Sequence, residues 1–483
     1  MERAMLIPLL IFISVLMGLF CTQSEAAGEA GMPDVNDAAP GRADSGTSKT
    51  EEVKNPAVLS GLKVTAEKGK LRVQAGRAEI RDLVANLNTD VMLDAVAPDP
   101  IPVEEEVRLW TDPPNRWQSR TKLNGSSLGN TAPAPYMLVP GTVRIRDRRG
   151  SVYTQGRDYI LDEDWNAVSL KKRSRMKADT PYIAEYQLGP RALDAVVLDA
   201  SGSARVIKGK PAIRNPLPPE CPKDSIVLAY LYWPGAGRIE LQQKNIFPKG
   251  PEWTPPEETS RMSSRIPRTM ARLKAGKPVT IVCWGDSVTH GGDAEPREEK
   301  RYSTLLEKAL QEQYPNVRVE NVAVGGSNSL QWTEPNNQRA IERWGDERPQ
   351  WKWIADKKPD LVTIEFVNDC GLSDWKAFEK QYTLILNRIR KLNAEVILIT
   401  PHFTMLSMMG FEDMRQRESR PYVKNLYRFA KKHNLALADV SCRWEHLWKQ
   451  GLPYVSLLNN GINHPDNRGH EIFKQELMRC FEE

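Results

Sequence analysis

Cysteine is scarce in this sequence. Its six cysteines are spread over 483 residues, and no two of them form a Cys-x-x-Cys pair. A disulfide-stapled scaffold needs dense cysteines and a structural zinc site needs paired ones, so the sequence predicts neither of them and no metal site. We interpret the cysteines as mostly buried thiols, with at most one or two bridges among them.

Long apolar runs are also scarce. The longest, Leu6–Phe20, follows a short charged start and precedes small residues that end at Ala26. A run of this length is short for a membrane-spanning helix and is typical of a secretory signal. We therefore expect residues 1–26 to be a signal peptide, with an uncleaved anchor as the alternative. The mature protein is then secreted or periplasmic and has no stable membrane span.

Charge of one sign does not accumulate along the chain. The 67 Lys and Arg nearly balance the 62 Asp and Glu, and the basic run at 170–177 stands alone. Nucleic-acid-binding proteins usually gather basic residues over one face. We interpret the run as a solvated turn rather than a polyanion site, so nucleic acid is not an expected partner.

The first half of the mature chain lacks helical periodicity. Residues 27–55 contain almost no large apolar side chain and cannot offset the entropy of ordering, which predicts a disordered linker. Residues 56–254 place apolar side chains at every second position around turns at 67–69, 147–150 and 234–237, which predicts three hairpins. We expect one β-sandwich-like domain or two small ones, with a carbohydrate-binding or a structural role.

The periodicity changes after the Pro-rich stretch 248–256, which predicts a stiff linker. In residues 255–483, strand-like runs alternate five times with helical segments, the clearest of which is expected to be capped by Ser373. This alternation predicts an α/β domain, with a parallel sheet covered on both faces and the flavodoxin-like strand order 2-1-3-4-5. The expected strands are 279–284, 317–324, 361–367, 396–400 and 435–440.

Polar residues follow the ends of these strands. Ser287 follows the first strand, Gly325-Gly326 the second and Asn368 the third, and His464 lies near the C-terminus. The carboxyl ends of parallel strands meet in one crevice, so we expect these groups to lie together. A hydroxyl, an imidazole, backbone amides and a carboxamide are the groups that acyl transfer needs as nucleophile, base and oxyanion donors.

Four blocks of residues resemble the SGNH, or GDSL, hydrolase family. They are GDS at 285–287, NVAVGG at 321–326, VND at 367–369 and NHP at 463–465, in the family's order, within a resemblance that covers about 265–483. The resemblance implies a three-layer α/β/α fold and no cofactor.

Residue roles follow from the same resemblance. It implies that Ser287 is the nucleophile and His464 the base, and that the oxyanion hole is formed by the N–H groups of Ser287 and Gly326 and the side-chain amide of Asn368. Each residue also has a structural alternative: an N-cap for Ser287, a plain turn glycine for Gly326 with Gly325 as its rival, and a turn residue for Asn368.

Two positions depart from the family's pattern. Phe366 stands where the third block usually has Gly, and Gly461 stands three residues before His464, where the family usually has Asp. If Asn463 is an insertion, the equivalent position is Asn460, which is therefore the candidate for orienting His464. An amide cannot stabilise an imidazolium as a carboxylate does, so a Ser-His dyad or a weakened enzyme stays open.

Other polar and apolar residues near the strand ends have no motif. We interpret His290 and His402 as lining or structural residues. An apolar cluster after the fourth strand could line an acyl pocket, although core packing is the favoured interpretation; it comprises Met405, Met408, Met409 and Phe411.

The resemblance, the expected export and the attached β region together predict a function. We expect a secreted serine esterase that cleaves acetyl esters on carbohydrate through an acyl-Ser287 intermediate. The alternatives are a lipase or thioesterase on the same fold, and a catalytically weakened carbohydrate-binding protein.

Overall fold

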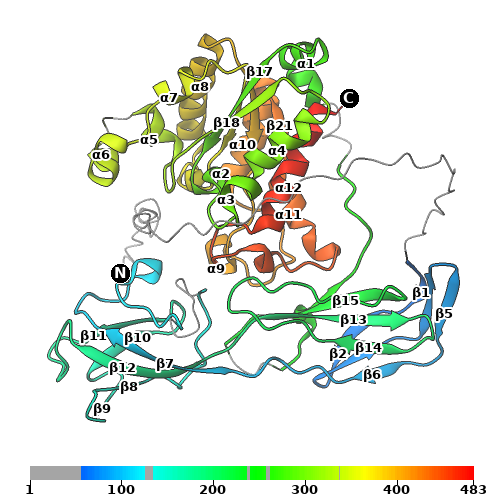
Figure 1. Ribbon diagram of the computed structural model, residues 1–483, viewed down its shortest axis with the longest axis vertical. Helices are drawn as coiled ribbons and strands as arrows, with labels where there is room; N and C mark the ends of the chain where they lie inside the picture. Colours follow the sequence, from blue (N-terminus) through cyan, green and yellow to red (C-terminus); the bar gives the residue numbers. More distant parts are fainter. Residues whose placement is uncertain are drawn as a thin grey trace, which may run out of the picture.

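The chain folds into a C-terminal α/β region that is seated on a long β region in the computed structural model (Figure 1). The structure describes residues 56–125, 134–236, 240–256, 262–334, 336 and 338–482. The expected signal peptide and the expected linker 27–55 lie outside these residues. In the described part, no helix combines the length and the hydropathy that crossing a bilayer requires.

Five parallel strands form the sheet of the α/β region. They are β17 (Val279–Gly285), β18 (Val317–Ala323), β19 (Leu361–Glu365), β20 (Glu395–Ile399) and β21 (Ala436–Ala438). Their order is β18-β17-β19-β20-β21, and every neighbouring pair is parallel. The predicted order 2-1-3-4-5 and the five predicted strands are confirmed.

Helices cover both faces of this sheet. Alternate side chains of β17 face opposite ways, because Ile281 and Cys283 belong to one apolar core while Val282 and Trp284 belong to the other. The first core is closed by α1 (Pro267–Lys274), α4 (Tyr302–Gln311) and α12 (Asn467–Met478), and the second by α8 (Trp375–Lys391) and α10 (Pro421–His433). The predicted three-layer α/β/α architecture is confirmed.

Helix α8 begins one residue later than the sequence predicted. The Asp374 carboxylate accepts a hydrogen bond from the N–H of Ala377 at 2.9 Å, so Asp374 is the N-cap and the predicted cap at Ser373 is wrong. The shorter helices of the region are α2 (Ser287–His290), α3 (Arg297–Lys300), α5 (Ser329–Thr333), α6 (Gln338–Trp344), α7 (Lys352–Ala355), α9 (Leu406–Met409) and α11 (Val440–Glu445).

The β region is built around two apolar cores. The outer core is formed by β2 (Val64–Glu67), β3 (Lys70–Val73), β4 (Gly76–Ile80), β5 (Leu83–Leu87), β6 (Val91–Leu93), β13 (Ala192–Asp199), β14 (Ala204–Ile207), β15 (Ser225–Trp233) and β16 (Ile246–Pro248). The exposed strand β1 (Ala57–Gly61) pairs with β4 at the edge of its sheet. The inner core lies in an inserted unit, residues 101–188, with β7 (Ile101–Arg108), β8 (Arg144–Arg146), β9 (Val152–Tyr153), β10 (Tyr159–Asp162), β11 (Ala167–Leu170) and β12 (Pro181–Leu188). The strand pairs of both units are antiparallel.

Two of the three predicted hairpins are confirmed. Strands β2 and β3 pair around the 67–69 turn, and β8 pairs with β9 around 147–150. The third prediction is wrong, because β15 pairs with β16 rather than with residues 239–241. Leu241 is instead buried in the outer core outside any strand, while residue 239 lies outside the described residues.

The β region and the α/β region share an apolar contact. Leu193, Tyr232 and Phe247 of the β region cluster with partly buried side chains of the α/β region, among them Met414 and Trp448. The stretch predicted to be a stiff linker is docked as well, since the ring of Trp253 lies 4.9 Å from that of His446. The two regions are therefore packed against each other.

The five cysteines of the described part are free thiols. Cys283 and Cys480 are buried, whereas Cys370 is exposed and Cys221 and Cys442 are half-buried. The interpretation as buried thiols therefore holds for two of the five.

Candidate active site

Ser287 is held at the carboxyl end of β17 by a tight turn. A Cβ on Gly285 would lie 2.0 Å from Thr289 Oγ1 and 2.3 Å from the Glu365 carbonyl oxygen, so only glycine fits there. Asp286 is the N-cap of α2 and accepts a hydrogen bond from the N–H of Val288 at 3.1 Å. The N-cap role that was the alternative for Ser287 thus belongs to Asp286.

The imidazole of His464 lies between Ser287 and an aspartate. Its Nε2 is 2.9 Å from Ser287 Oγ, and its Nδ1 is 2.6 Å from Asp293 Oδ2. A carboxylate can only accept, so Nδ1 carries the proton and the neutral imidazole accepts from the Ser287 hydroxyl through Nε2. A Cβ on Gly292 would lie 3.0 Å from two atoms of the ring, so the glycine leaves room for this approach.

The Asp293 carboxylate is charged at neutral pH. Burial alone would raise its pKa, but the hydrogen bond from His464 and the positive charges of Arg214 and Arg297 hold that pKa below its ordinary value. A charged carboxylate on Nδ1 fixes the imidazole tautomer and stabilises the imidazolium that forms when Nε2 takes a proton. Ser287, His464 and Asp293 therefore have the geometry of a catalytic triad.

Asn460 does not reach the imidazole and closes the turn before His464. Its Oδ1 accepts from the N–H groups of Ile462, Asn463 and His464 at 2.8, 2.9 and 3.0 Å. Its Nδ2 donates to Asn463 Oδ1 at 3.1 Å. Both polar atoms of the Asn460 side chain are engaged within the turn. The structure therefore does not place Asn460 as the hydrogen-bond partner of the His464 ring.

Asp293 was not predicted from the sequence, because it lies in the loop that follows Ser287 and not in the residues that precede His464. The family's pattern places the orienting Asp just before the His, where this chain has Asn460 and Gly461. The loop after α2 carries Gly291-Gly292-Asp293, a carboxylate preceded by two glycines and placed beside the nucleophile turn. That signal was present in the sequence and could have identified Asp293.

The candidate oxyanion donors lie along the same edge of the sheet. Asn368 lies in the 3-10 turn Val367–Gly371 after β19, and its backbone N–H donates to Asp286 Oδ2 at 3.0 Å. One hydrogen of its Nδ2 is donated to the Ser327 carbonyl at 3.0 Å, which leaves the second for another acceptor. The Gly325-Gly326 loop faces Ser287, since a Cβ on Gly325 would lie 4.0 Å from Ser287 Cβ.

His402 supports the loop that carries His464. It is fully buried, and its Nε2 donates to the carbonyl oxygen of Asn463 at 2.8 Å. Burial lowers the pKa of His402 to about 3, so the ring is neutral and does not compete with His464 as a base. The interpretation of His402 as a structural residue agrees with these contacts.

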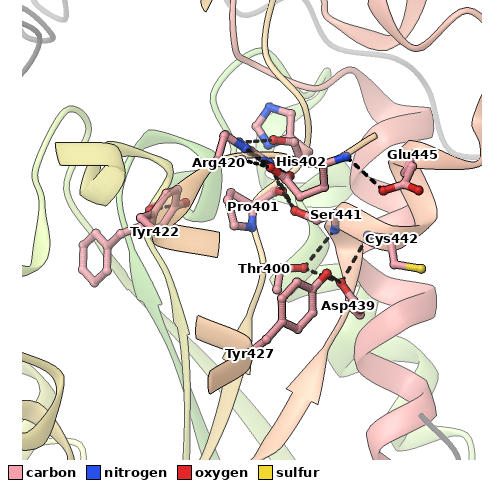
Figure 2. Close-up of polar contacts among 12 residues, drawn as sticks. Thr400, Pro401, His402, Arg420, Tyr422, Tyr427, Asp439, Ser441, Cys442 and Glu445 are labelled. Carbon is pink, nitrogen blue, oxygen red and sulfur yellow. Dashed lines mark hydrogen bonds and ion pairs between the residues drawn. The ribbon is translucent and has the colours of Figure 1, made fainter. Parts of the chain in front are cut away.

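A half-buried arginine holds the backbone around His402 (Figure 2). Arg420 donates to the carbonyl oxygens of Pro401 and His402 at 2.9 and 3.0 Å and forms an ion pair with Glu418 at 2.6 Å. A paired guanidinium with several carbonyl acceptors is a rigid anchor. The path from Arg420 through His402 to Asn463 therefore fixes the backbone next to His464.

The remaining residues near the site have packing roles. His290 lies on α2 with its Nε2 3.2 Å from Arg297 Nη1. In the apolar cluster after β20, Met405, Met409 and Phe411 are buried and Met408 is exposed, which favours core packing over an acyl pocket. In the described part of the chain, no group of three or more His, Cys, Asp or Glu residues could hold a metal ion.

Three buried carboxyl groups lie beneath the nucleophile turn. Asp286, Glu365 and Asp369 are all nearly inaccessible to solvent, and burial raises the pKa of each of them, that of Asp369 to about 6. Asp369 accepts hydrogen bonds from the Ser329 N–H and the Tyr382 hydroxyl at 2.9 and 2.8 Å. These three carboxyl groups are therefore protonated more readily than exposed ones.

Residues 283–472 match the model of the GDSL-like Lipase/Acylhydrolase family. The match includes Ser287, Asp293, Asn368 and His464, and it begins inside β17 and ends inside α12. The α/β region therefore carries a hydrolase domain of the GDSL, or SGNH, type. No curated protein sequence matches the chain.

Several solved structures are similar to part of the chain. A two-domain esterase active on acetylated mannans is 20% identical, with 44% of this chain and 52% of that chain covered and a TM-score of 0.34. An acetylxylan esterase from Geobacillus stearothermophilus is 21% identical, with 42% and 94% covered and a TM-score of 0.32. The chain thus spans about half the length of the two-domain esterase that it matches.

Proposed function

We propose, on the premise that residues 283–472 form a GDSL-type hydrolase domain, that this protein is a serine esterase acting on acetyl esters of carbohydrate. The observation that carries the proposal is the contact of His464 with Ser287 at 2.9 Å on one side and with Asp293 at 2.6 Å on the other. A hydroxyl, a base and a charged orienting group in series are what acyl transfer requires.

The reaction begins with attack of Ser287 Oγ on the ester carbonyl carbon. His464 Nε2 takes the hydroxyl proton as the C–O bond forms, and the charge on Asp293 stabilises the resulting imidazolium. When the tetrahedral intermediate collapses, the bond to the sugar oxygen breaks and His464 returns the proton to that oxygen. Water then attacks the acyl-Ser287 ester by the same route and releases acetate.

The negative charge of each tetrahedral intermediate needs donors that are already in place. We assign this role to the N–H groups of Ser287 and Gly326, with Gly325 as the rival of Gly326, and to the second hydrogen of Asn368 Nδ2. The Ser287 N–H is the first of helix α2, where no carbonyl of the same helix can accept it. Losing one such donor typically slows acyl transfer by about 10²–10³-fold.

A carbohydrate substrate is favoured by the surroundings of His464. The inserted β unit borders the His464 loop, since a Cβ on Gly461 would lie 2.9 Å from Ala134 Cβ. We expect a sugar chain to lie along the β region beside the triad, whereas a long acyl chain would need an apolar channel. The expected signal peptide places the protein outside the cytoplasm, where polysaccharides occur.

Turnover of p-nitrophenyl acetate tests the chemistry. Wild type should hydrolyse it, Ser287→Ala should lose nearly all activity, and the exposed Ser373→Ala should behave as wild type. Equal rates for wild type and Ser287→Ala would overturn the esterase assignment. Comparing acetylated oligosaccharides with octanoyl esters then tests the substrate class, and a preference for octanoyl esters would contradict it.

A further inference from the structure

The β region reaches the candidate active site through the segment 211–216, between β14 and β15. Asn215 Nδ2 donates to Asp466 Oδ2 at 3.0 Å, and Arg468 Nη2 donates to the Pro216 carbonyl at 3.5 Å. Asp466 stands two residues after His464 and is the N-cap of α12. The segment is therefore fixed at Asn215 and Pro216, and the neighbouring Arg214 is held beside the triad.

Arg214 forms no ion pair with the residues that the structure describes, although its charge acts on Asp293. Its Nε is buried without a hydrogen-bond partner, and the guanidinium forms no hydrogen bond or ion pair with the residues that the structure describes. Other arginines of the β region are paired, as Arg175 is with Asp158 at 2.8 Å. A partly buried guanidinium that lacks an acceptor is costly, which points to an acceptor that arrives from outside the chain.

A second arginine borders the triad from the other side. Arg297 begins α3, and a Cβ on Gly291 would lie 3.1 Å from its Cγ, so it packs on the loop that leads to Asp293. The one hydrogen bond of its side chain to a described residue is with His290 Nε2, a neutral acceptor. By contrast, Arg301 pairs with Glu298 at 2.6 Å.

The two cations share the Asp293 carboxylate. Both Arg214 and Arg297 lie near enough to Asp293 to lower the pKa of its carboxyl group. That carboxylate is the only charge set against them in the triad, and one of its oxygens already accepts from His464 at 2.6 Å. Both guanidinium groups are therefore available to an additional anion beside the reacting groups.

We propose that Arg214 and Arg297 form an anion-binding subsite at the rim of the triad, which binds a carboxylate or sulfate group on the sugar chain of the ester substrate. The inference rests on the proposed function and narrows its substrate class to acidic, acetylated carbohydrates. A guanidinium presents paired N–H groups that match the oxygens of carboxylate and sulfate. Arg214 would thus make the β region a direct contributor to substrate choice.

Three acetylated oligosaccharides of matched length test the proposal: a neutral one, one with uronic acid residues and one with sulfate esters. Wild type should have a lower KM for at least one acidic substrate than for the neutral one, and this preference should weaken as salt is raised. In Arg214→Gln the preference should fall by about tenfold or more, as expected for loss of a charge-assisted hydrogen bond. Arg297→Gln should act in the same direction.

Arg390→Gln is the matched control, because it removes one positive charge just as Arg214→Gln does. Arg390 is exposed near the end of α8, just before β20 begins, and so lies at the opposite edge of the sheet from the triad. The Arg390→Gln variant should have the same rates, and the same preference for acidic over neutral substrates, as wild type. Which acidic substrate is preferred distinguishes carboxylate from sulfate.

Two outcomes would overturn the subsite. One is equal KM values of wild type for neutral and acidic substrates. The other is an equal loss on all substrates in Arg214→Gln, which would mean that Arg214 acts through Asp293 alone. Either result leaves the esterase assignment intact provided that wild type cleaves p-nitrophenyl acetate, so failure of the subsite is distinct from failure of the proposed function.

Discussion

Asp293 and His464 meet at 2.6 Å although 171 positions separate them in the chain. The carboxylate comes from the loop after the nucleophile helix, and the imidazole from the loop before the last helix. The order along the chain is Ser, Asp, His, with the aspartate six residues after Ser287. A triad is recognised by geometry and not by sequence order, so this order is compatible with the proposed chemistry.

Replacing Asp293 by Asn should slow the enzyme severely while leaving the fold intact. The amide keeps the shape but cannot stabilise the imidazolium, and in a comparable triad the exchange lowers kcat by about 10⁴. Steady-state turnover of p-nitrophenyl acetate measures the effect, with circular dichroism as the check on folding.

Asn460→Asp is the companion variant. Its Oδ1 should still accept the three backbone N–H groups, and only the donor to Asn463 is lost, so we expect kcat within about tenfold of wild type. A mild effect of Asp293→Asn, together with a rate of Asn460→Asp at or above that of wild type, would return the orienting role to Asn460, because a carboxylate there would serve His464 at least as well as the amide.

His402 should control how well His464 is placed. His402→Phe keeps a ring in the core but removes the donor to the Asn463 carbonyl, and an unpaired buried carbonyl costs about 1–3 kcal/mol. We expect kcat to fall by about tenfold or more, because the loop that carries His464 shifts to pair this carbonyl. His402→Gln, whose amide can donate to the same oxygen, should recover part of the loss. No recovery in His402→Gln would indicate that only the packing of the ring matters.

Gly461 should be far less tolerant of alanine than Gly276. Both glycines have positive φ, +68° and +62°, so alanine strains either backbone by about 1 kcal/mol. A Cβ on Gly276 meets nothing within 4 Å, whereas one on Gly461 would lie 2.9 Å from Ala134 Cβ and 3.0 Å from Arg191 Nη1.

Thermal unfolding and p-nitrophenyl acetate turnover compare the two glycine variants. Gly461→Ala should lose about 2–3 kcal/mol and lower kcat, because the overpacked contact displaces the His464 loop. Gly276→Ala should affect stability only. Equal effects of the two substitutions would show that the contact between the inserted unit and the loop is loose.

Asp369 should make the stability of the protein depend on pH. Burial raises the pKa of Asp369 from 3.8 to about 6, so its contribution is complete below about pH 4 and is lost as pH rises through 6. The loss amounts to about 3 kcal/mol or less. Asp369→Asn mimics the protonated group and should gain melting temperature relative to wild type between pH 4 and 7. The exposed Asp346→Asn should show no such trend, and a pH-independent difference for Asp369→Asn would contradict the assignment.

The α/β sheet was predictable because each strand has a strong local signature. Val279 to Trp284 alternates between two apolar cores, and such a run is buried on both faces whatever surrounds it. Phe366 shows how a departure from the family's pattern is accommodated, since its ring packs 5.2 Å from Trp284 in one of these cores. The β region was harder to predict. Strand β16 pairs with β15 across a long connection, and no local sequence pattern indicates the length of that connection.

The candidate site was predictable where a residue follows a strand end. Ser287 and Asn368 were identified in this way, His464 was identified from the NHP block, and Gly325-Gly326 faces Ser287 as expected. Asp293 and Arg214 were not identified, because their relation to His464 depends on how separate loops and separate regions pack together. Contacts of this kind are set by the tertiary fold and leave no periodicity in the sequence.

The ends of the inserted β unit are neighbours. Ile101, at its beginning, pairs with Leu188, at its end. The two connections between this unit and the outer core therefore lie side by side. If the unit were replaced by another one, a short connection at each end would suffice to join it to the strands of the outer core. Ala134 of the inserted unit packs against the loop that carries His464. Replacing the inserted unit would therefore change which substrates fit beside the triad without altering the triad itself.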